Sequence, residues 1–294
     1  RQMMPLAFAA GIGGTITLVG TPPNIIAVGA MKAAGITPFG FFEFAWIGIP
    51  LTIAGILYMV FIGKHLLPKA ADVNTEVDAE AEEEARVMTH SVTKQWITGL
   101  TLLFVVIVMA LDLKSLPLEV AATFGALFLV VTKCIGEKAA YKGIDWVTIF
   151  LFAGMLPIAT AMDKSGAGKL IADWVVSLMG STPSPIVVTA VLFALAAGLT
   201  QFMSNTAATA LLAPIAIGIA QGLNVSPHAV MMAVAIAASC AFATPVGTPP
   251  NTLVLGPGGY KFMDYVKAGS GLVLVCLIVS VIIIPIVWPF ALPM

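Results

Sequence analysis

The pentapeptide GTPPN occurs twice in this chain, at residues 20–24 and again at residues 247–251, each time inside a long apolar stretch. Two consecutive prolines remove two backbone donors and clash with the preceding turn, so a helix cannot run through them. The threonine before them is a favoured N-cap residue, and proline is favoured at the first helical position. Each copy is therefore predicted to end one helix and begin another within an apolar segment.

The composition indicates an all-α polytopic membrane protein. Of the 294 residues, 59% are hydrophobic and only 10% are charged, against roughly 25% charged in an ordinary soluble domain. The net charge of −1 and the three scattered cysteines suggest neither a nucleic-acid partner nor a metal or disulfide framework. A bilayer-spanning helix needs about 20 mostly apolar residues. Candidate segments lie at residues 3–31, 45–63, 95–111, 117–132, 144–162, 185–222, 228–258 and 268–291.

The hydrophilic linker at residues 64–94 sets the predicted orientation. It holds seven of the fifteen acidic residues and is expected to be a solvated loop. Lys and Arg are retained on the cytoplasmic side of short loops. A cytoplasmic linker leaves ten basic residues inside and only Lys32, Lys114, Lys164 and Lys169 outside. The prediction is therefore a multi-pass cell-membrane protein with its C-terminus outside.

In this topology the two GTPPN copies lie on spans that run in opposite directions. The similarity continues downstream at an offset of 221 residues, where Phe41, Phe44, Gly48 and Leu51 correspond to Phe262, Tyr265, Gly269 and Leu272. Inverted repeats with interrupted helices at matching positions are typical of secondary transporters. The predicted parts are the end of a first inverted repeat at 1–63, the linker at 64–94 and a second repeat at 95–294. Within the second repeat we expect scaffold helices at 95–180, a hairpin at 185–222, a broken helix at 228–258 and a last helix at 268–291.

Three consecutive polar residues, Ser204, Asn205 and Thr206, interrupt the apolar stretch between the copies. The arms on either side, about 19 and 16 residues long, are marginal for full spans. A re-entrant hairpin with these residues at its tip fits better, and it would bring the tip to the membrane midplane beside the second GTPPN. Alone, such a triplet usually joins helices by hydrogen bonds.

The absence of charged residues around the motifs argues against an enzyme and against a proton-driven carrier. Residues 185–260 contain no Asp, Glu, Lys or Arg, whereas an intramembrane enzyme or a proton-driven carrier would normally have buried acids or bases. A helix that ends within the membrane frees carbonyls that protein, water or an ion must take up. Neutral oxygens suit Na⁺, and bound Na⁺ could supply the positive charge that an anionic substrate requires.

At these residues the sequence resembles the divalent anion/sodium symporter family, the di- and tricarboxylate carriers of the ion transporter superfamily. The features that carry the resemblance are SNT at 204–206, the TPPN-type break some forty residues later, and the inverted partner of that break. The resemblance covers essentially the whole chain. It implies Na⁺-coupled transport of a C4-dicarboxylate such as succinate or malate, or of citrate, by an elevator motion in a homodimer.

The resemblance also implies site residues. Na⁺ in the second site would be held by Asn205, Ser204 and the carbonyls of Thr200 and Gly247, and in the first site by Gly20. Substrate would contact Asn205, Thr206, Thr248, Pro249 and Thr21. In the family an SNT hairpin also precedes the first break, by some forty residues. In this sequence only nineteen residues precede the first GTPPN. We therefore expect this sequence to be the C-terminal part of a longer carrier, with the N-terminal part missing.

Several alternatives stay open. A sodium-independent dicarboxylate exchanger, or a carrier of sulfate or another inorganic anion, would use the same fold. A receptor-like or structural membrane subunit would be expected to show a soluble domain or charged loops that hold a partner, and the longest loop is only the linker. A membrane enzyme is disfavoured because buried titratable groups are lacking in the motif region.

Overall fold

The computed structural model describes residues 2–68, 92–111, 117–144 and 184–291, together with single positions between 146 and 177. The described part is helical and divides into two units, residues 1–73 with 148–294, and residues 74–147. Most of the predicted linker at 64–94 and of the predicted span at 144–162 lies outside the described residues. The larger unit holds both GTPPN motifs.

The first motif interrupts a helix as predicted. Helix α1 (Met3–Gly13) continues into a short 3-10 turn, η1 (Gly14–Ile16), and α2 (Pro22–Ala33) begins at the first proline of the motif. After a loop, α3 (Ala45–Tyr58) continues through a π-helical turn, η2 (Met59–Gly63), into α4 (Lys64–Leu66). The apolar helix predicted at 45–63 therefore extends three residues into the predicted linker.

The second half of the larger unit repeats this order after two additional helices. These are α11 (Pro185–Thr200) and α12 (Asn205–Gly222), separated by four residues. The broken helix consists of α13 (Pro227–Ala238) and α14 (Pro249–Leu255), and α15 (Phe262–Val287) follows. Helix α15 begins six residues before the predicted 268, because the Asp264 carboxylate accepts the Lys261 N–H at 2.8 Å and satisfies a free donor at the helix start.

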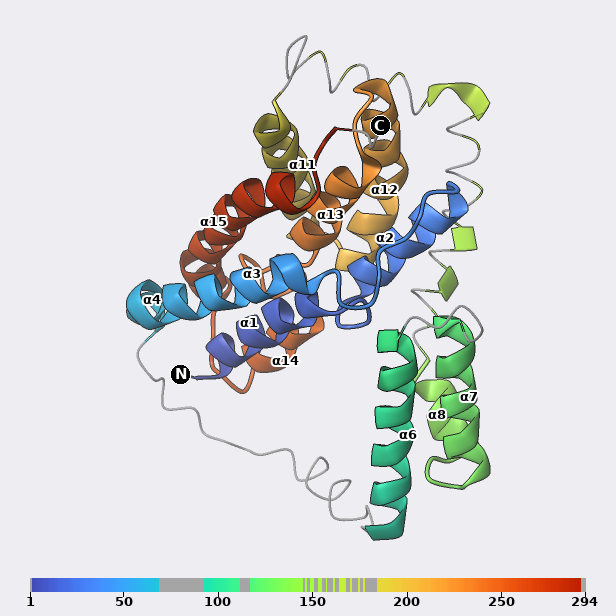
Figure 1. Ribbon diagram of the computed structural model, residues 1–294. Helices are drawn as coiled ribbons and strands as arrows, with labels where there is room; N and C mark the ends of the chain where they lie inside the picture. Colours follow the sequence, from blue (N-terminus) through green and yellow to red (C-terminus); the bar gives the residue numbers. More distant parts are fainter. Residues whose placement is uncertain are drawn as a thin grey trace. The chain divides into compact units, whose positions relative to one another are not determined.

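Helix α13 forms the centre of the larger unit. Every residue from Ala229 to Ala238 is fully buried, because α13 is surrounded by α2, α11, α12 and α15. Helix α1 packs against α14 and α3, and α3 also packs against α15 (Figure 1). The small side chains of the sequence AVAIAA at 233–238 allow these neighbours to approach closely.

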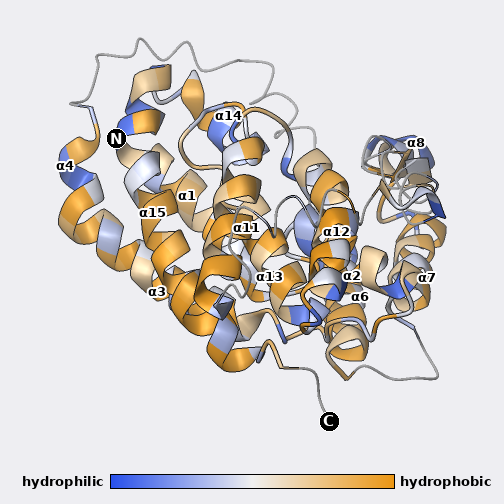
Figure 2. Cartoon of the chain, turned by 90° about the horizontal axis from the view of Figure 1, so that it is seen from above, coloured by the Kyte–Doolittle hydropathy of each residue, from blue (hydrophilic) through white to orange (hydrophobic). Residues whose placement is uncertain are grey.

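Apolar side chains also cover the outside of this unit. On α15 the exposed residues Leu274, Ile278, Ile282 and Ile286 recur every four positions and form one stripe. Helix α3 carries a similar exposed stripe, and both helices are mostly hydrophobic along their length (Figure 2). Within the described residues, Ala45–Leu66, Val92–Leu111 and Phe262–Val287 are long and apolar enough to cross a membrane. These apolar outer faces suit lipid contact and fit the predicted membrane protein.

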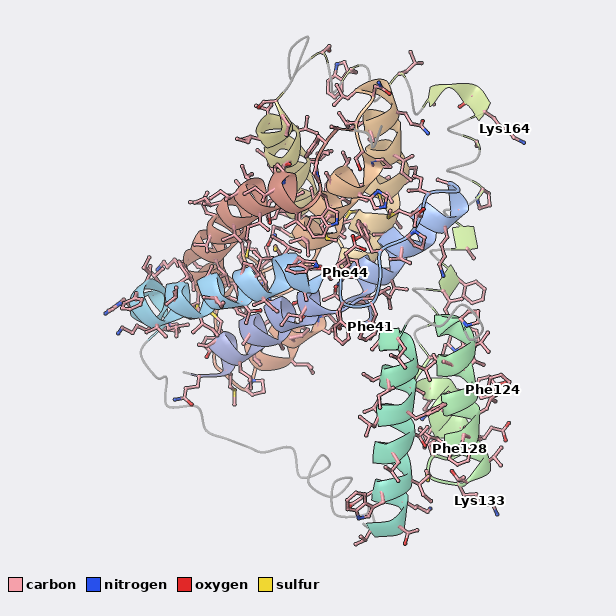
Figure 3. The ribbon with its side chains drawn as sticks, in the orientation of Figure 1. Phe41, Phe44, Phe124, Phe128, Lys133 and Lys164 are labelled. Carbon is pink, nitrogen blue, oxygen red and sulfur yellow. The ribbon has the colours of Figure 1, made fainter. Side chains whose placement is uncertain are left out.

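The smaller unit contains α6 (Val92–Leu111), α7 (Leu118–Val131) and α8 (Glu137–Lys142). Helices α6 and α7 pack together, and the absence of a side chain at Gly125 leaves room for Val105. Phe124 and Phe128 project from α7 one turn apart and are exposed, and Lys133 follows the end of that helix (Figure 3).

Candidate functional site

The two GTPPN motifs adopt the same backbone conformation. Thr21 is the N-cap of α2 with φ −138° and ψ 145°, and Thr248 is the N-cap of α14 with φ −136° and ψ 146°. Both threonines are mostly buried. Neither hydroxyl makes the capping hydrogen bond that sequence reasoning allowed. The following prolines have no N–H, so the first donors of each new helix are already absent and the hydroxyls are left for other partners.

The asparagine that ends each motif is held in a matching way. The Asn24 Nδ2 donates to the Thr17 carbonyl at 2.9 Å, and the Asn251 Nδ2 donates to the Thr244 carbonyl at 3.0 Å. Each bond reaches back seven residues across the break. The Asn251 amide also donates to the Ala241 carbonyl at 2.9 Å. These bonds fix each amide orientation, because a flipped amide would set Oδ1 against a carbonyl oxygen.

The other side of each amide has no partner among the described residues. Asn24 and Asn251 are 0% and 1% exposed, and neither Oδ1 atom accepts a hydrogen bond. An unsatisfied buried acceptor costs about 1–3 kcal/mol. Because an asparagine Oδ1 without a hydrogen bond occurs at both breaks, we attribute this feature to the GTPPN motif itself. Only a donor, such as a water, or a cation would satisfy these oxygens.

Close backbone approaches also recur at both breaks. A side chain at Gly20 would overlap the Gly14 carbonyl, and one at Gly247 would lie 2.6 Å from the Ala241 Cβ and 2.9 Å from the Thr200 carbonyl oxygen. Gly14 and Ala241 are themselves equivalent positions, 227 residues apart. Glycine is therefore required at the first motif position, and at Gly247 the break lies directly against the end of α11.

The helix after each break packs onto that break through a glycine. A side chain at Gly48 on α3 would lie 2.6 Å from the Thr15 carbonyl oxygen, and one at Gly269 on α15 would overlap the Phe242 carbonyl. The two glycines correspond at the offset of 221 residues seen in the sequence. At the second break, Tyr265 adds a hydrogen bond from its hydroxyl to the Asn251 carbonyl at 2.8 Å.

The turn between α11 and α12 contacts the second break. The Thr200 Oγ1 lies 2.7 Å from the Asn205 Oδ1 and 2.8 Å from the Ala238 carbonyl oxygen, both within donating distance. One hydroxyl has one proton, so it serves only one of these acceptors at a time. The Thr200 hydroxyl thus joins the tip to the C-terminal end of α13.

Ser204 and Thr206 lie at the start of α12. The Ser204 Oγ accepts the Ala207 N–H at 3.1 Å as an N-cap, which engages one of its lone pairs. Thr206 is half-buried in the first turn, and Ser204 is exposed. At the second break, Thr248 is buried and Pro249 is exposed. The structure thus brings Thr200, Asn205 and Gly247 to the contact of tip and break.

Thr21 lies at a different contact. Its Oγ1 is 3.2 Å from the Ser239 Oγ, which follows α13. The Ser239 hydroxyl also lies within donating distance of the Ala235 carbonyl, at 3.1 Å. A carbonyl only accepts, so when Ser239 donates to it, the bond between the hydroxyls takes its proton from Thr21.

Sequence reasoning missed Gln201 and Ser239. Gln201 is mostly buried and makes hydrogen bonds to Ala197, Cys240 and Ala243. Its partners in the break are 39 and 42 residues away in the chain. The sequence offered one signal for Gln201: it is the one amide or charged residue between residues 185 and 204.

Comparison with known proteins identifies the family of this chain. Residues 1–230 match the family described as Citrate transporter (CitMHS). Over 186 aligned residues the chain is 42% identical to the uncharacterized transporter YfbS of Escherichia coli. These residues cover 63% of this chain and 30% of the relative. It is 32% identical to an uncharacterized transporter of Haemophilus influenzae, over 94% of this chain and 60% of the relative.

A further relative has a more specific name. The sodium-dependent dicarboxylate transporter SdcS of Staphylococcus saprophyticus is 29% identical over 301 residues, which cover 96% of this chain and 57% of the relative. The chain thus spans less than two thirds of the length of each of these relatives. The family and these relatives are transporters, not enzymes. The resemblance inferred from SNT and the paired GTPPN motifs is confirmed, and the chain belongs to the citrate transporter family of membrane carriers.

Proposed function

We propose that this protein carries a divalent organic anion across the cell membrane together with Na⁺, by secondary active transport. The observation that carries the proposal is the pair of matched helix breaks, each with a buried amide oxygen that has no partner among the described residues. Such oxygens attract cations in a region of the sequence without charged side chains. The sodium dependence in the name of the relative SdcS agrees with this reading.

Helix packing supports an inverted repeat. The first half of one broken helix, α1, packs against the second half of the other, α14, and α2 packs against α13 (Figure 1). Two neighbouring two-part helices with this pairing run in opposite directions. The proposed re-entrant hairpin is formed by α11 and α12, whose 16 and 18 residues are short for full spans.

The proposed second Na⁺ site lies where the hairpin tip meets the second break. Asn205, Ser204 and the carbonyls of Thr200 and Gly247 would surround the ion. Gly247 is packed against the Thr200 carbonyl oxygen, so the two backbone segments are already adjacent. Gly20, the equivalent glycine of the first break, would contribute to the first site.

The dianion would be bound beside these ions by Asn205, Thr206, Thr248, Pro249 and Thr21. Thr248 is mostly buried, and its hydroxyl has no hydrogen-bond partner among the described residues, which leaves its proton for an anion. Without Lys or Arg between 185 and 260, bound Na⁺ would supply the compensating charge. Cation and anion would therefore bind cooperatively, which couples their transport.

The hairpin and the two broken helices would move against the scaffold helices, in an elevator motion within a homodimer. The linker would be cytoplasmic and the C-terminus outside. A sodium-independent dicarboxylate exchanger, or a carrier of sulfate or another inorganic anion, remains the second candidate, because the same breaks and hairpin would serve either. The names of the relatives from Escherichia coli and Haemophilus influenzae give no substrate, so they are compatible with this second candidate.

The test is uptake of labelled succinate, citrate and sulfate by the native protein in liposomes, with and without a sodium gradient. We expect succinate or citrate uptake that requires the gradient. Brisk counterflow without sodium would refute the symport and favour the exchanger, and preference for sulfate would refute the organic substrate.

Asn205→Ala tests the site itself. We expect loss of transport with normal membrane insertion. The control is Asn224→Gly beyond the other end of α12, where φ of 53° already favours glycine. Normal uptake by Asn205→Ala would remove the hairpin tip from the site.

A further inference from the structure

Gln201 is the first residue after α11 and directly follows Thr200. It is mostly buried, and all the hydrogen-bonding capacity of its side-chain N–H groups is used. Nε2 donates to the Ala197 carbonyl at 2.8 Å and to the Cys240 carbonyl at 3.1 Å. Oε1 accepts the Ala243 N–H at 3.0 Å. One side chain thus links its own helix to two points of the second break.

These contacts specify one orientation of the amide. If Nε2 and Oε1 were exchanged, an oxygen would face two carbonyls and an NH₂ would face an N–H, so three favourable contacts would become unfavourable. A fourth bond comes from the opposite direction, because the Thr244 Oγ1 donates to the Gln201 carbonyl at 2.8 Å. The break between Cys240 and Thr244 therefore folds around Gln201.

The segment held in this way leads directly to Gly247. Two residues separate Thr244 from Gly247, and Gly247 lies against the carbonyl of Thr200, the neighbour of Gln201. The Gln201 bonds therefore fix the two carbonyls of the proposed second sodium site relative to each other. A small shift between the tip and the break would change their separation, and a cation site is sensitive to such changes in oxygen positions.

We propose that Gln201 is a positioning residue for the second Na⁺ site, one that sets the affinity for the ion without touching ion or substrate. The inference rests on the proposed sodium-coupled transport. Gln201 keeps the Gly247 backbone against the Thr200 carbonyl, so that binding of Na⁺ does not have to order the tip.

The test substitutes Gln201→Met, which keeps the length of the side chain and removes its hydrogen bonds. The sodium concentration for half-maximal succinate uptake should rise about tenfold, because the variant loses three side-chain hydrogen bonds and part of their free energy is passed on to the ion site. At saturating sodium, the KM for succinate should change much less. General loss of packing would instead lower the amount of active protein and leave the half-saturating sodium concentration unchanged.

Two further variants serve as a control and as a second test of the role of Gln201. Gln221→Met, at an exposed position near the end of α12, should leave sodium dependence unchanged. Thr244→Val removes only the bond to the Gln201 carbonyl and should give a smaller shift in the same direction, which keeps the proposal testable if Gln201→Met is not inserted.

The outcomes separate this inference from the proposed function. Uptake by the unsubstituted protein without sodium would refute the symport, whatever the variants do. Sodium-dependent uptake with the same half-saturating sodium concentration in Gln201→Met, or in Thr244→Val if Gln201→Met is not inserted, would refute only the role of Gln201.

Discussion

A methyl group added at Gly269 should destabilise the larger unit strongly. Gly269 lies on α15 where that helix crosses the second break, and a Cβ there would overlap the Phe242 carbonyl and lie 2.8 Å from the Ala243 nitrogen. These neighbours are backbone atoms and cannot rotate away. Phe242 is also held by Phe8, with ring centroids 5.4 Å apart. Overpacking in a rigid core costs about 1–3 kcal/mol, and Gly269→Ala should lie at the upper end of that range.

The measurement is thermal unfolding of the purified native protein in detergent. Gly198→Ala is the matched control, because it also lies on a helix, α11, and apart from that helix's own backbone no described atom lies within 4 Å of the new Cβ. The control should gain up to about 1 kcal/mol from the better helix propensity of alanine. At about 2–4 °C per kcal/mol for a unit of this size, the two variants should differ by roughly 5–15 °C in Tm. Equal stability would refute the close packing of α15 on the break.

Three further substitutions test the same region. Gly247→Ala should abolish sodium-dependent uptake while insertion stays normal, because its Cβ would displace the facing Ala241 Cβ at 2.6 Å; unchanged uptake would contradict the tight contact. Ser239→Ala should lower the KM for the dianion a few-fold, because Thr21 regains a free hydroxyl proton. A raised KM would show instead that the Ser239 hydroxyl supports substrate binding. Trp288→Phe should lower stability by about 1–2 kcal/mol in thermal unfolding, because it removes the 2.7 Å bond from its indole N–H to a half-buried carboxylate.

The breaks were predictable because local chemistry decides them. Two prolines cannot continue a helix, and both motifs indeed begin a helix at Pro22 and Pro249. The start of α12 at Ser204 was predictable for a similar reason, because a serine before an apolar run is a favoured N-cap. The correspondence of Gly48 with Gly269 followed from aligning the two copies, and each glycine contacts its own break.

The contacts that tie these pieces together could not be predicted from local patterns. The hydroxyl contact between Thr21 and Ser239 joins residues 218 positions apart, and Gln201 reaches partners about forty positions away. The start of α15 was misplaced for a different reason. The apolar run begins after Lys267, but the Asp264 carboxylate caps the helix earlier and lets polar residues form its first turn.

Thr21 and Thr248 have the same backbone conformation in the two breaks but different surroundings, and one difference lies at the position of Ser239. The residue equivalent to Ser239 in the first copy is Ile12, which offers no hydroxyl. Thr21 therefore has a hydrogen-bond partner across the two copies, whereas the described residues provide none for Thr248. When Ser239 donates to Ala235, the Thr21 proton is used and only its lone pairs remain. The first break then presents acceptors, which suit a cation, and the second presents a free donor, which suits an anion. Under the proposed function, the two breaks would therefore offer different partners to the two ends of a dianion.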